Sequence, residues 1–123
     1  MFGLSILLLL SSNQIAVIDG DTIRVGHERV RLLGIDAPEF PGHCRKGRAC
    51  APGDPSASKR NLKALLTGSV RIIPVARDRY GRVVAQVYSG GRNVACEQLR
   101  AGQAVYVGHW DNGGRLGREC RQP

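Results

Sequence analysis

Apolar and polar positions alternate along short stretches of the chain, and this pattern predicts a protein built mainly of β-strands. Residues 14–18 and 22–25 read as two strands around Asp19-Gly20, which is a strong signal for a two-residue hairpin turn. A turn is also expected at 78–81, between two later strands. The predicted extended segments are 14–18, 22–25, 29–35, 70–75, 83–88 and 104–107.

Two further segments carry helix signals. Asp54 is a suitable N-cap for a helix over 55–67, in which leucines form an apolar stripe. Asn93 is expected to cap a shorter helix that continues through Ala101. From Gly108 onward the sequence predicts an irregular, basic tail.

Three strands, a helix, two strands and a second helix follow one another in the order typical of an OB-fold. We therefore expect a mainly β (β+α) fold, a five-stranded barrel with one helix after strand three and a short second helix. The chain of 123 residues has room for one domain, which we place at 13–123.

Residues 1–12 form an apolar segment that is too short to span a bilayer, which requires about 20 apolar residues. Its length suits a secretory signal, but no Lys or Arg precedes it and no clear cleavage site follows. We interpret it as a degenerate or truncated signal. The alternative is an N-terminal extension of the first strand.

The composition is that of a folded globule, with 42% hydrophobic and 23% charged residues. The formal net charge is +8, and most of the basic residues are arginines. Because the guanidinium group suits phosphate, this excess favours a nucleic acid or another phosphorylated partner over a merely basic soluble protein.

Four cysteines are present, without a Cys-x-x-Cys motif or histidines at a zinc-like spacing. In an exported protein they would form two disulfides, and Cys44 with Cys50 plus Cys96 with Cys120 is the simplest of the three possible connectivities. In a reducing cytosol they would be four thiols. The set favours a secreted or periplasmic location.

Acidic residues gather around the third predicted strand of this basic protein. Strand alternation places Asp21 and Arg31 on apolar faces, where charged groups need partners, and Asp36 and Glu39 follow at the strand exit. Carboxylates of this kind suit calcium or magnesium, while Arg31 and Arg82 suit a phosphate beside the metal. Each residue alone fits a structural turn or a surface ion pair, but the combination favours phosphodiester chemistry.

Three motifs in this order resemble the staphylococcal nuclease (thermonuclease) family. They are Val-Ile-Asp-Gly-Asp-Thr at 17–22, Arg-Leu-Leu-Gly-Ile-Asp-Ala-Pro-Glu at 31–39 and Asp-Arg-Tyr-Gly-Arg at 78–82. The stretch 93–102 resembles the family's next helix more weakly, and the whole resemblance covers about residues 14–107.

The resemblance implies a calcium (Ca²⁺) site. By this likeness Asp21 and Asp36 bind the ion through their carboxylates, Ala37 contributes its backbone carbonyl, and Asp19 assists nearby. Because a backbone carbonyl is present at every residue type, Ala37 loses no ligand.

The resemblance also implies the catalytic groups. Glu39 is expected to act as general base on the attacking water, while Arg31 and Arg82 hold the phosphate and offset its developing charge. The residues expected to contact a terminal phosphate or the nucleotide are Arg79, Tyr80 and Tyr106.

The expected activity is a calcium-dependent endonuclease that hydrolyses DNA and RNA with little sequence specificity, since few groups could read base edges. We expect a monomer without a protein partner. One alternative is a non-catalytic OB-fold module that binds nucleic acid. Another is a disulfide-stapled interaction protein without a nucleic-acid partner, whose binding would be insensitive to salt and calcium.

The chain departs from the family in three places. The family's final helix is missing or shortened, because residues 110–123 are rich in glycine, and a Cys96–Cys120 bridge would tie that tail down. A second tyrosine expected after Tyr106 is absent, and Gly108 stands in its place. The third departure is the pair Cys44 and Cys50 in a long surface loop predicted over 38–55, whose basic residues could approach the substrate backbone: Arg45, Lys46 and Arg48.

Overall fold

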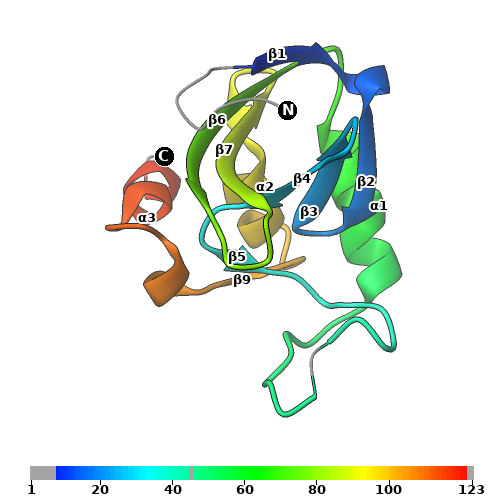
Figure 1. Ribbon diagram of the computed structural model, residues 1–123, viewed down its shortest axis with the longest axis vertical. Helices are drawn as coiled ribbons and strands as arrows, with labels where there is room; N and C mark the ends of the chain where they lie inside the picture. Colours follow the sequence, from blue (N-terminus) through cyan, green and yellow to red (C-terminus); the bar gives the residue numbers. More distant parts are fainter. Residues whose placement is uncertain (1–7, 45, 122–123) are drawn as a thin grey trace.

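A curled, half-barrel sheet and three α-helices make up the protein in the computed structural model, which describes residues 8–44 and 46–121 (Figure 1). The sheet has seven strands in the order β1-β6-β7-β4-β3-β2, and β8 pairs with β7. A separate two-stranded sheet pairs β5 with β9. The strands are β1 Leu8–Ser11, β2 Ile15–Asp19, β3 Thr22–Val25, β4 Glu28–Leu32, β5 Ile35–Asp36, β6 Ser69–Arg77, β7 Val83–Ser89, β8 Arg92–Asn93 and β9 Val105–Tyr106.

The mixed β and α composition is as predicted, but the main sheet has seven strands where five were expected. Two short strands account for the difference, since β1 pairs antiparallel with β6 and β8 pairs antiparallel with β7. The signal-like segment predicted at 1–12 lies partly outside the described residues, and within it Leu8–Ser11 form β1. Arg45 also lies outside the described residues.

The turn between β2 and β3 differs by one residue from the prediction. Asp19 pairs with Thr22, so Gly20 and Asp21 form the turn, whereas Asp19-Gly20 was expected. The cause is a register shift between Val17 and Asp19, a bulge that moves the turn along the chain.

The single strand predicted over 29–35 is divided into β4 and β5. Gly34 lies between them with φ of 78°, a left-handed conformation that a strand cannot contain. β4 pairs antiparallel with β3 and parallel with β7, so it lies inside the sheet. β5 leaves the sheet and directs the next residues toward the β2–β3 turn.

The two predicted helices are confirmed as α1 Pro55–Leu65 and α2 Val94–Arg100. Asp54 caps α1 by accepting from the Ser56 N–H, and Asn93 caps α2 by accepting from the Ala95 N–H. Short 3₁₀ helices occur at Ser12–Gln14 and Gly108–Trp110. Among the described residues no helix is long and apolar enough to cross a membrane.

The prediction of an irregular tail from Gly108 onward is wrong, because Arg115–Cys120 form a third helix, α3. The buried Asp111 carboxylate accepts hydrogen bonds from the N–H groups of Leu116 (2.7 Å) and Gly117 (2.9 Å). These bonds satisfy amides that have no partner within the helix. The tail therefore contains a helix whose first turn is fixed by a buried carboxylate.

Both disulfides form in the simplest of the predicted connectivities. Cys44–Cys50 closes part of the long loop between β5 and α1. Cys96–Cys120 joins α2 to α3, and Leu116 on α3 is fully buried in the hydrophobic core.

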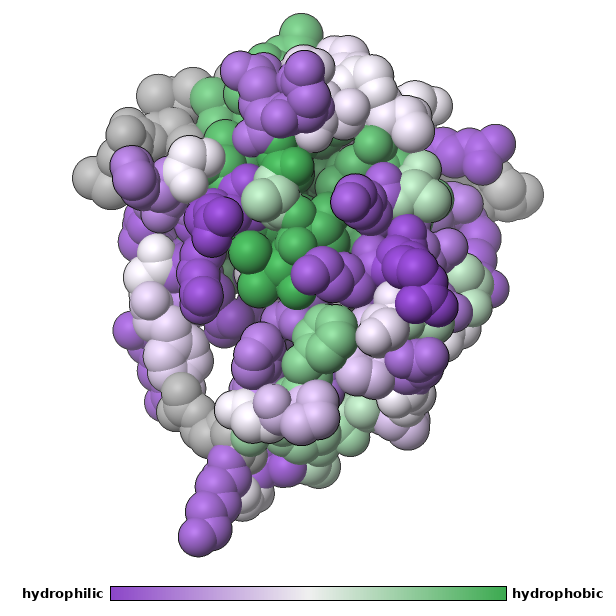
Figure 2. Space-filling view, turned by 90° about the vertical axis from the view of Figure 1, so that its right-hand side faces the viewer, coloured by the Kyte–Doolittle hydropathy of each residue, from purple (hydrophilic) through white to green (hydrophobic). Residues whose placement is uncertain are grey.

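The face of the molecule turned toward the viewer in Figure 2 has a hydrophobic centre (green) surrounded by hydrophilic side chains (purple).

Candidate active site

Asp21 lies at the β2–β3 turn and is almost fully buried, with 2% of its surface exposed. Its Oδ2 accepts from the Ala37 N–H at 2.9 Å and pairs with Arg31 Nη1 at 3.1 Å. Its Oδ1 accepts from the Thr22 hydroxyl at 2.8 Å. These partners fix the carboxylate and connect the turn to the residues that follow β5.

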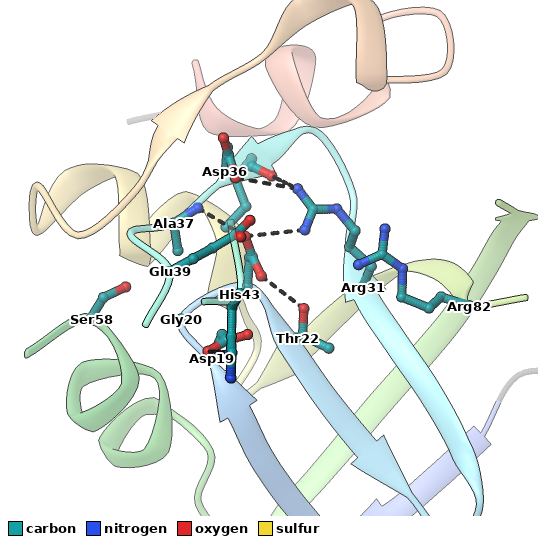
Figure 3. A network of polar contacts seen from close by, with 12 residues as sticks. Asp19, Gly20, Thr22, Arg31, Asp36, Ala37, Glu39, His43, Ser58 and Arg82 are labelled. Atoms are coloured by element: carbon teal, nitrogen blue, oxygen red, sulfur yellow. Dashed lines mark hydrogen bonds and ion pairs between the residues drawn. The ribbon is translucent and has the colours of Figure 1, made fainter. Parts of the chain in front are cut away.

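Arg31, on β4, points toward the acidic residues at the ends of β2, β3 and β5 (Figure 3). Besides Asp21, its guanidinium reaches Asp36 Oδ1 at 3.6 Å and donates to the Ile35 carbonyl at 3.0 Å. Asp36 is 4% exposed and pairs through Oδ2 with Arg48 Nη1 at 3.2 Å. The sequence placed Arg31, Asp21 and Asp36 in one site, and the structure brings them together.

The turn that carries Asp21 is supported from behind by the two longer helices. The fully buried Gln98 of α2 donates to the Gly20 carbonyl at 2.8 Å and to the Ser58 carbonyl of α1 at 3.0 Å. The Ser58 hydroxyl donates to the Gln103 carbonyl at 2.7 Å. The sequence did not predict this role of Gln98, because no local pattern indicates that a buried glutamine donates hydrogen bonds to a distant turn.

Asp19 ends β2 beside this group, and His43 Nδ1 approaches its Oδ1 at 3.7 Å. Burial raises the pKa of Asp19 above its usual value, the charge of Asp21 raises it further, and His43 opposes the shift. Burial also raises the pKa of Asp36; Arg48 opposes that shift and Asp21 adds to it. Burial therefore outweighs the neighbouring cationic groups at both carboxyls.

Two buried carboxylate oxygens of this group are chemically suited to a cation. Asp19 Oδ1 and Asp36 Oδ1 are buried without a hydrogen-bond partner among the described residues, and carboxylate oxygens are the ligands that calcium prefers. No group of three or more His, Cys, Asp or Glu side chains in the described chain could hold a metal by itself. The expected ligand set has only two carboxylates and a backbone carbonyl, so water and substrate oxygens would complete it.

Glu39 follows β5 and has 13% of its side chain exposed. Its Oε1 forms an ion pair with Arg48 Nη2. Burial raises the pKa of Glu39, Arg48 opposes the shift, and Asp21 and Asp36 add to it. A carboxylate with a raised pKa at the edge of a cavity is suited to accept a proton.

Arg82 approaches from the turn before β7. Its Nε pairs with Asp78 Oδ2 at 2.7 Å, and its backbone N–H donates to Asp78 Oδ1 at 3.0 Å. The Tyr80 ring lies between two guanidiniums, 5.4 Å from that of Arg82 and 5.1 Å from that of Arg79. Asp78, which sequence reasoning treated only as a turn residue, thus orients Arg82.

A cavity of about 1010 Å³ is lined by Arg31, Glu39, Arg48 and Arg82. Trp110, which the sequence analysis did not single out, lines it and lies 4.8 Å from the Arg31 guanidinium. As the single tryptophan of the chain, Trp110 was a signal that could have been used. Tyr106 is not among the described residues that line the cavity, and its hydroxyl donates to Asp111. The basic lining residues are Arg29, Arg31, Lys46, Arg48, Arg77, Arg79 and Arg82.

Comparison with known families gives one match that covers most of the chain. A family model described as "Staphylococcal nuclease homologue" matches residues 29–118. This range includes Arg31, Asp36, Glu39 and Arg82, and it continues into α3.

Several curated proteins are similar to this chain. A probable endonuclease LCL3 of Paracoccidioides lutzii is 42% identical over 83 residues, which cover 62% of this chain and 23% of that protein. Endonuclease YncB of Bacillus subtilis is 37% identical over 71% of this chain and 43% of its own length. Succinoglycan biosynthesis protein ExoI of Rhizobium meliloti is 40% identical over 75% of this chain and 50% of its own length. The chain thus spans half or less of each of these relatives.

Proposed function

Because this chain belongs to the staphylococcal nuclease family, we propose that it is a calcium-dependent endonuclease that hydrolyses DNA and RNA with little sequence specificity. The observation that carries the proposal is the position of Arg31, which joins two buried carboxylates to a large basic cavity. Glu39 and Arg82 line the same cavity. A base, cationic clamps and metal-suited oxygens therefore meet in one place.

The arginines bind the substrate. Arg31 lines the cavity from β4 and Arg82 from the turn before β7, and their planar guanidiniums donate to the non-bridging oxygens of the scissile phosphate. Because Asp78 holds Arg82 and Asp21 holds Arg31, both donors are oriented before substrate arrives. Donors fixed in advance stabilise the charge that develops on phosphate in the transition state.

Glu39 acts as the general base. It lies at the cavity edge, accepts the proton of the attacking water, and must be ionised to do so. Asp21, Asp36 and the Ala37 carbonyl would hold calcium, with Asp19 beside them. When bound, calcium supplies Lewis-acid polarisation of the phosphate and lowers the cost of placing several carboxylates together.

Substrate selectivity follows from contacts to the backbone. Arg79 and Tyr80 lie at the same cavity and contact a terminal phosphate and the nucleotide. The position of Tyr106, whose hydroxyl is engaged by Asp111, favours a structural role for that residue. Contacts to phosphate carry no sequence information, so cleavage has little sequence preference.

The two disulfides support a secreted or periplasmic location.

Two substitutions test the assignment. Glu39→Gln removes the base and Arg82→Ala removes a phosphate donor, so each should lower cleavage of single-stranded DNA by about a hundredfold or more. The matched control is Arg60→Ala, an exposed arginine of α1 outside the cavity. Circular dichroism should show that all variants are folded. Cleavage at the wild-type rate in either site variant would contradict the proposed roles.

A further inference from the structure

Arg48 belongs to the long loop between β5 and α1 and contacts two functional carboxylates with one guanidinium. Nη1 lies 3.2 Å from Asp36 Oδ2, and Nη2 pairs with Glu39 Oε1. One planar fork therefore connects the residue proposed to hold calcium with the residue proposed as general base. The three-motif pattern of the family does not include Arg48.

Arg48 and Arg31 contact different oxygens of Asp36. Oδ2 accepts from Arg48 Nη1, while Oδ1 has no hydrogen-bond partner among the described residues and lies 3.6 Å from Arg31 Nη2. The two guanidiniums together therefore restrict the orientation of the Asp36 carboxylate. The contact of Arg48 with Glu39 is made through Oε1.

Two features hold Arg48 in this position. The Cys44–Cys50 disulfide closes the loop segment that contains it. The Trp110 ring lies 5.8 Å from the Arg48 guanidinium and 4.8 Å from that of Arg31, so one aromatic ring supports both arginines. With 28% of its side chain exposed, Arg48 also faces the cavity.

We propose that Arg48 is a positioning residue for this reaction, which orients Glu39 and Asp36 together through its guanidinium fork. The inference rests on the proposed nuclease function. The Arg48 guanidinium also lowers the affinity for calcium, because a fixed positive charge beside Asp36 repels a divalent cation. Arg48 therefore promotes turnover while it weakens metal binding.

Two variants separate shape from charge. Arg48→Lys keeps the positive charge but cannot form two parallel contacts, whereas Arg48→Gln removes the charge as well. Arg60→Gln on α1 is the control for net charge. The measurements are kcat and KM on single-stranded DNA at saturating calcium, and calcium affinity by isothermal titration calorimetry without substrate.

We expect Arg48→Gln to lower kcat about tenfold or more, since misplacement of catalytic groups is costly, with a smaller change in KM. The same variant should bind calcium several-fold more tightly, because a repulsive charge is removed. Arg48→Lys should also lower kcat but bind calcium like the wild type. A variant that is merely less well folded would show both a lower kcat and weaker calcium binding.

Wild-type kcat in Arg48→Gln, or weaker calcium binding by that variant, would overturn the proposal. Failure of the nuclease function itself has a different signature, namely a folded wild-type protein that binds calcium without cleaving DNA. In that case the calcium affinities alone decide whether Arg48 opposes the cation at Asp36.

Discussion

Individual carboxylates of the site lie where burial opposes their charge. The pKa values of Asp19, Asp36 and Glu39 are all raised, with burial as the first cause. Because the raised pKa belongs to the folded state, the stability contribution of these groups is present at low pH and is lost as pH rises through the folded pKa. At neutral pH they reduce stability, and this cost is typical of residues placed for function.

The raised pKa of Glu39 predicts the pH dependence of the reaction. A general base must be ionised, so kcat at saturating calcium should fall as pH decreases through this pKa. The fall should begin at a higher pH than the ordinary value of 4.5 would give. A kcat that stays constant through this range, in protein that remains folded, would exclude Glu39 as the base.

The close packing around Gly20 predicts that a larger residue at this position lowers the stability of the fold. A Cβ at this position would lie 1.8 Å from Ser58 Oγ and 2.9 Å from Ala37 Cβ, so Gly20→Ala must displace the turn or α1. We expect a loss of about 2 kcal/mol in the free energy of unfolding, together with reduced cleavage. Urea denaturation measures the first effect.

The control for that prediction is Gly108→Ala. The nearest atom to a Cβ there is Tyr106 Cε2 at 3.6 Å, an ordinary contact. Equal stability losses in the two variants would show that the close packing behind the turn is unimportant.

The motif residues could be predicted because their spacing is local and specific: Asp21, Arg31, Asp36 and Glu39 meet as expected. Arg48, Trp110 and Gln98 could not be assigned in the same way. Their roles depend on contacts across the fold, such as the 78-residue separation between Gln98 and Gly20. Such contacts leave no periodic or capping signal in the sequence.

Among the secondary structure elements, too, those with local sequence signals could be predicted and those that depend on contacts across the fold could not. The starts of α1 and α2 were predictable because Asp54 and Asn93 are local caps. The start of α3 was not, because its N-cap is Gly114, which offers no side-chain cap, and the carboxylate that accepts from its first N–H groups belongs to Asp111, outside the helix. β1 and β8 are strands only because β6 and β7 offer them partners.

The Cys96–Cys120 disulfide should stabilise this last element. The bridge spans a sequence separation of 24 residues and ties α3 to the buried Cys96 on α2. Replacing both cysteines by alanine should lower the free energy of unfolding by about 3 kcal/mol. Chemical denaturation under oxidising conditions measures this change.

The Cys44–Cys50 pair provides the comparison. It closes a separation of 6 residues within a loop, so its replacement by alanine should cost less stability than loss of Cys96–Cys120. If removal of Cys96–Cys120 leaves the unfolding midpoint unchanged, the disulfide does not anchor α3.

The molecule as a whole carries a formal net charge of +8, and seven Arg and Lys side chains line the cavity at the site. The buried carboxylates Asp21 and Asp36 pair with two of these residues, Arg31 and Arg48. A polyanionic substrate would be attracted to the cavity, and a cation would neutralise the carboxylates. This division of charge supports the proposed metal-dependent phosphodiesterase activity.

Cleavage of single-stranded DNA by the folded, oxidised protein should be measured in calcium, after chelation, and with magnesium in place of calcium. We predict cutting in calcium that stops when a chelator removes the ion. DNA binding without cleavage in every metal would contradict the enzyme proposal, and would identify the domain as a non-catalytic module that binds nucleic acid.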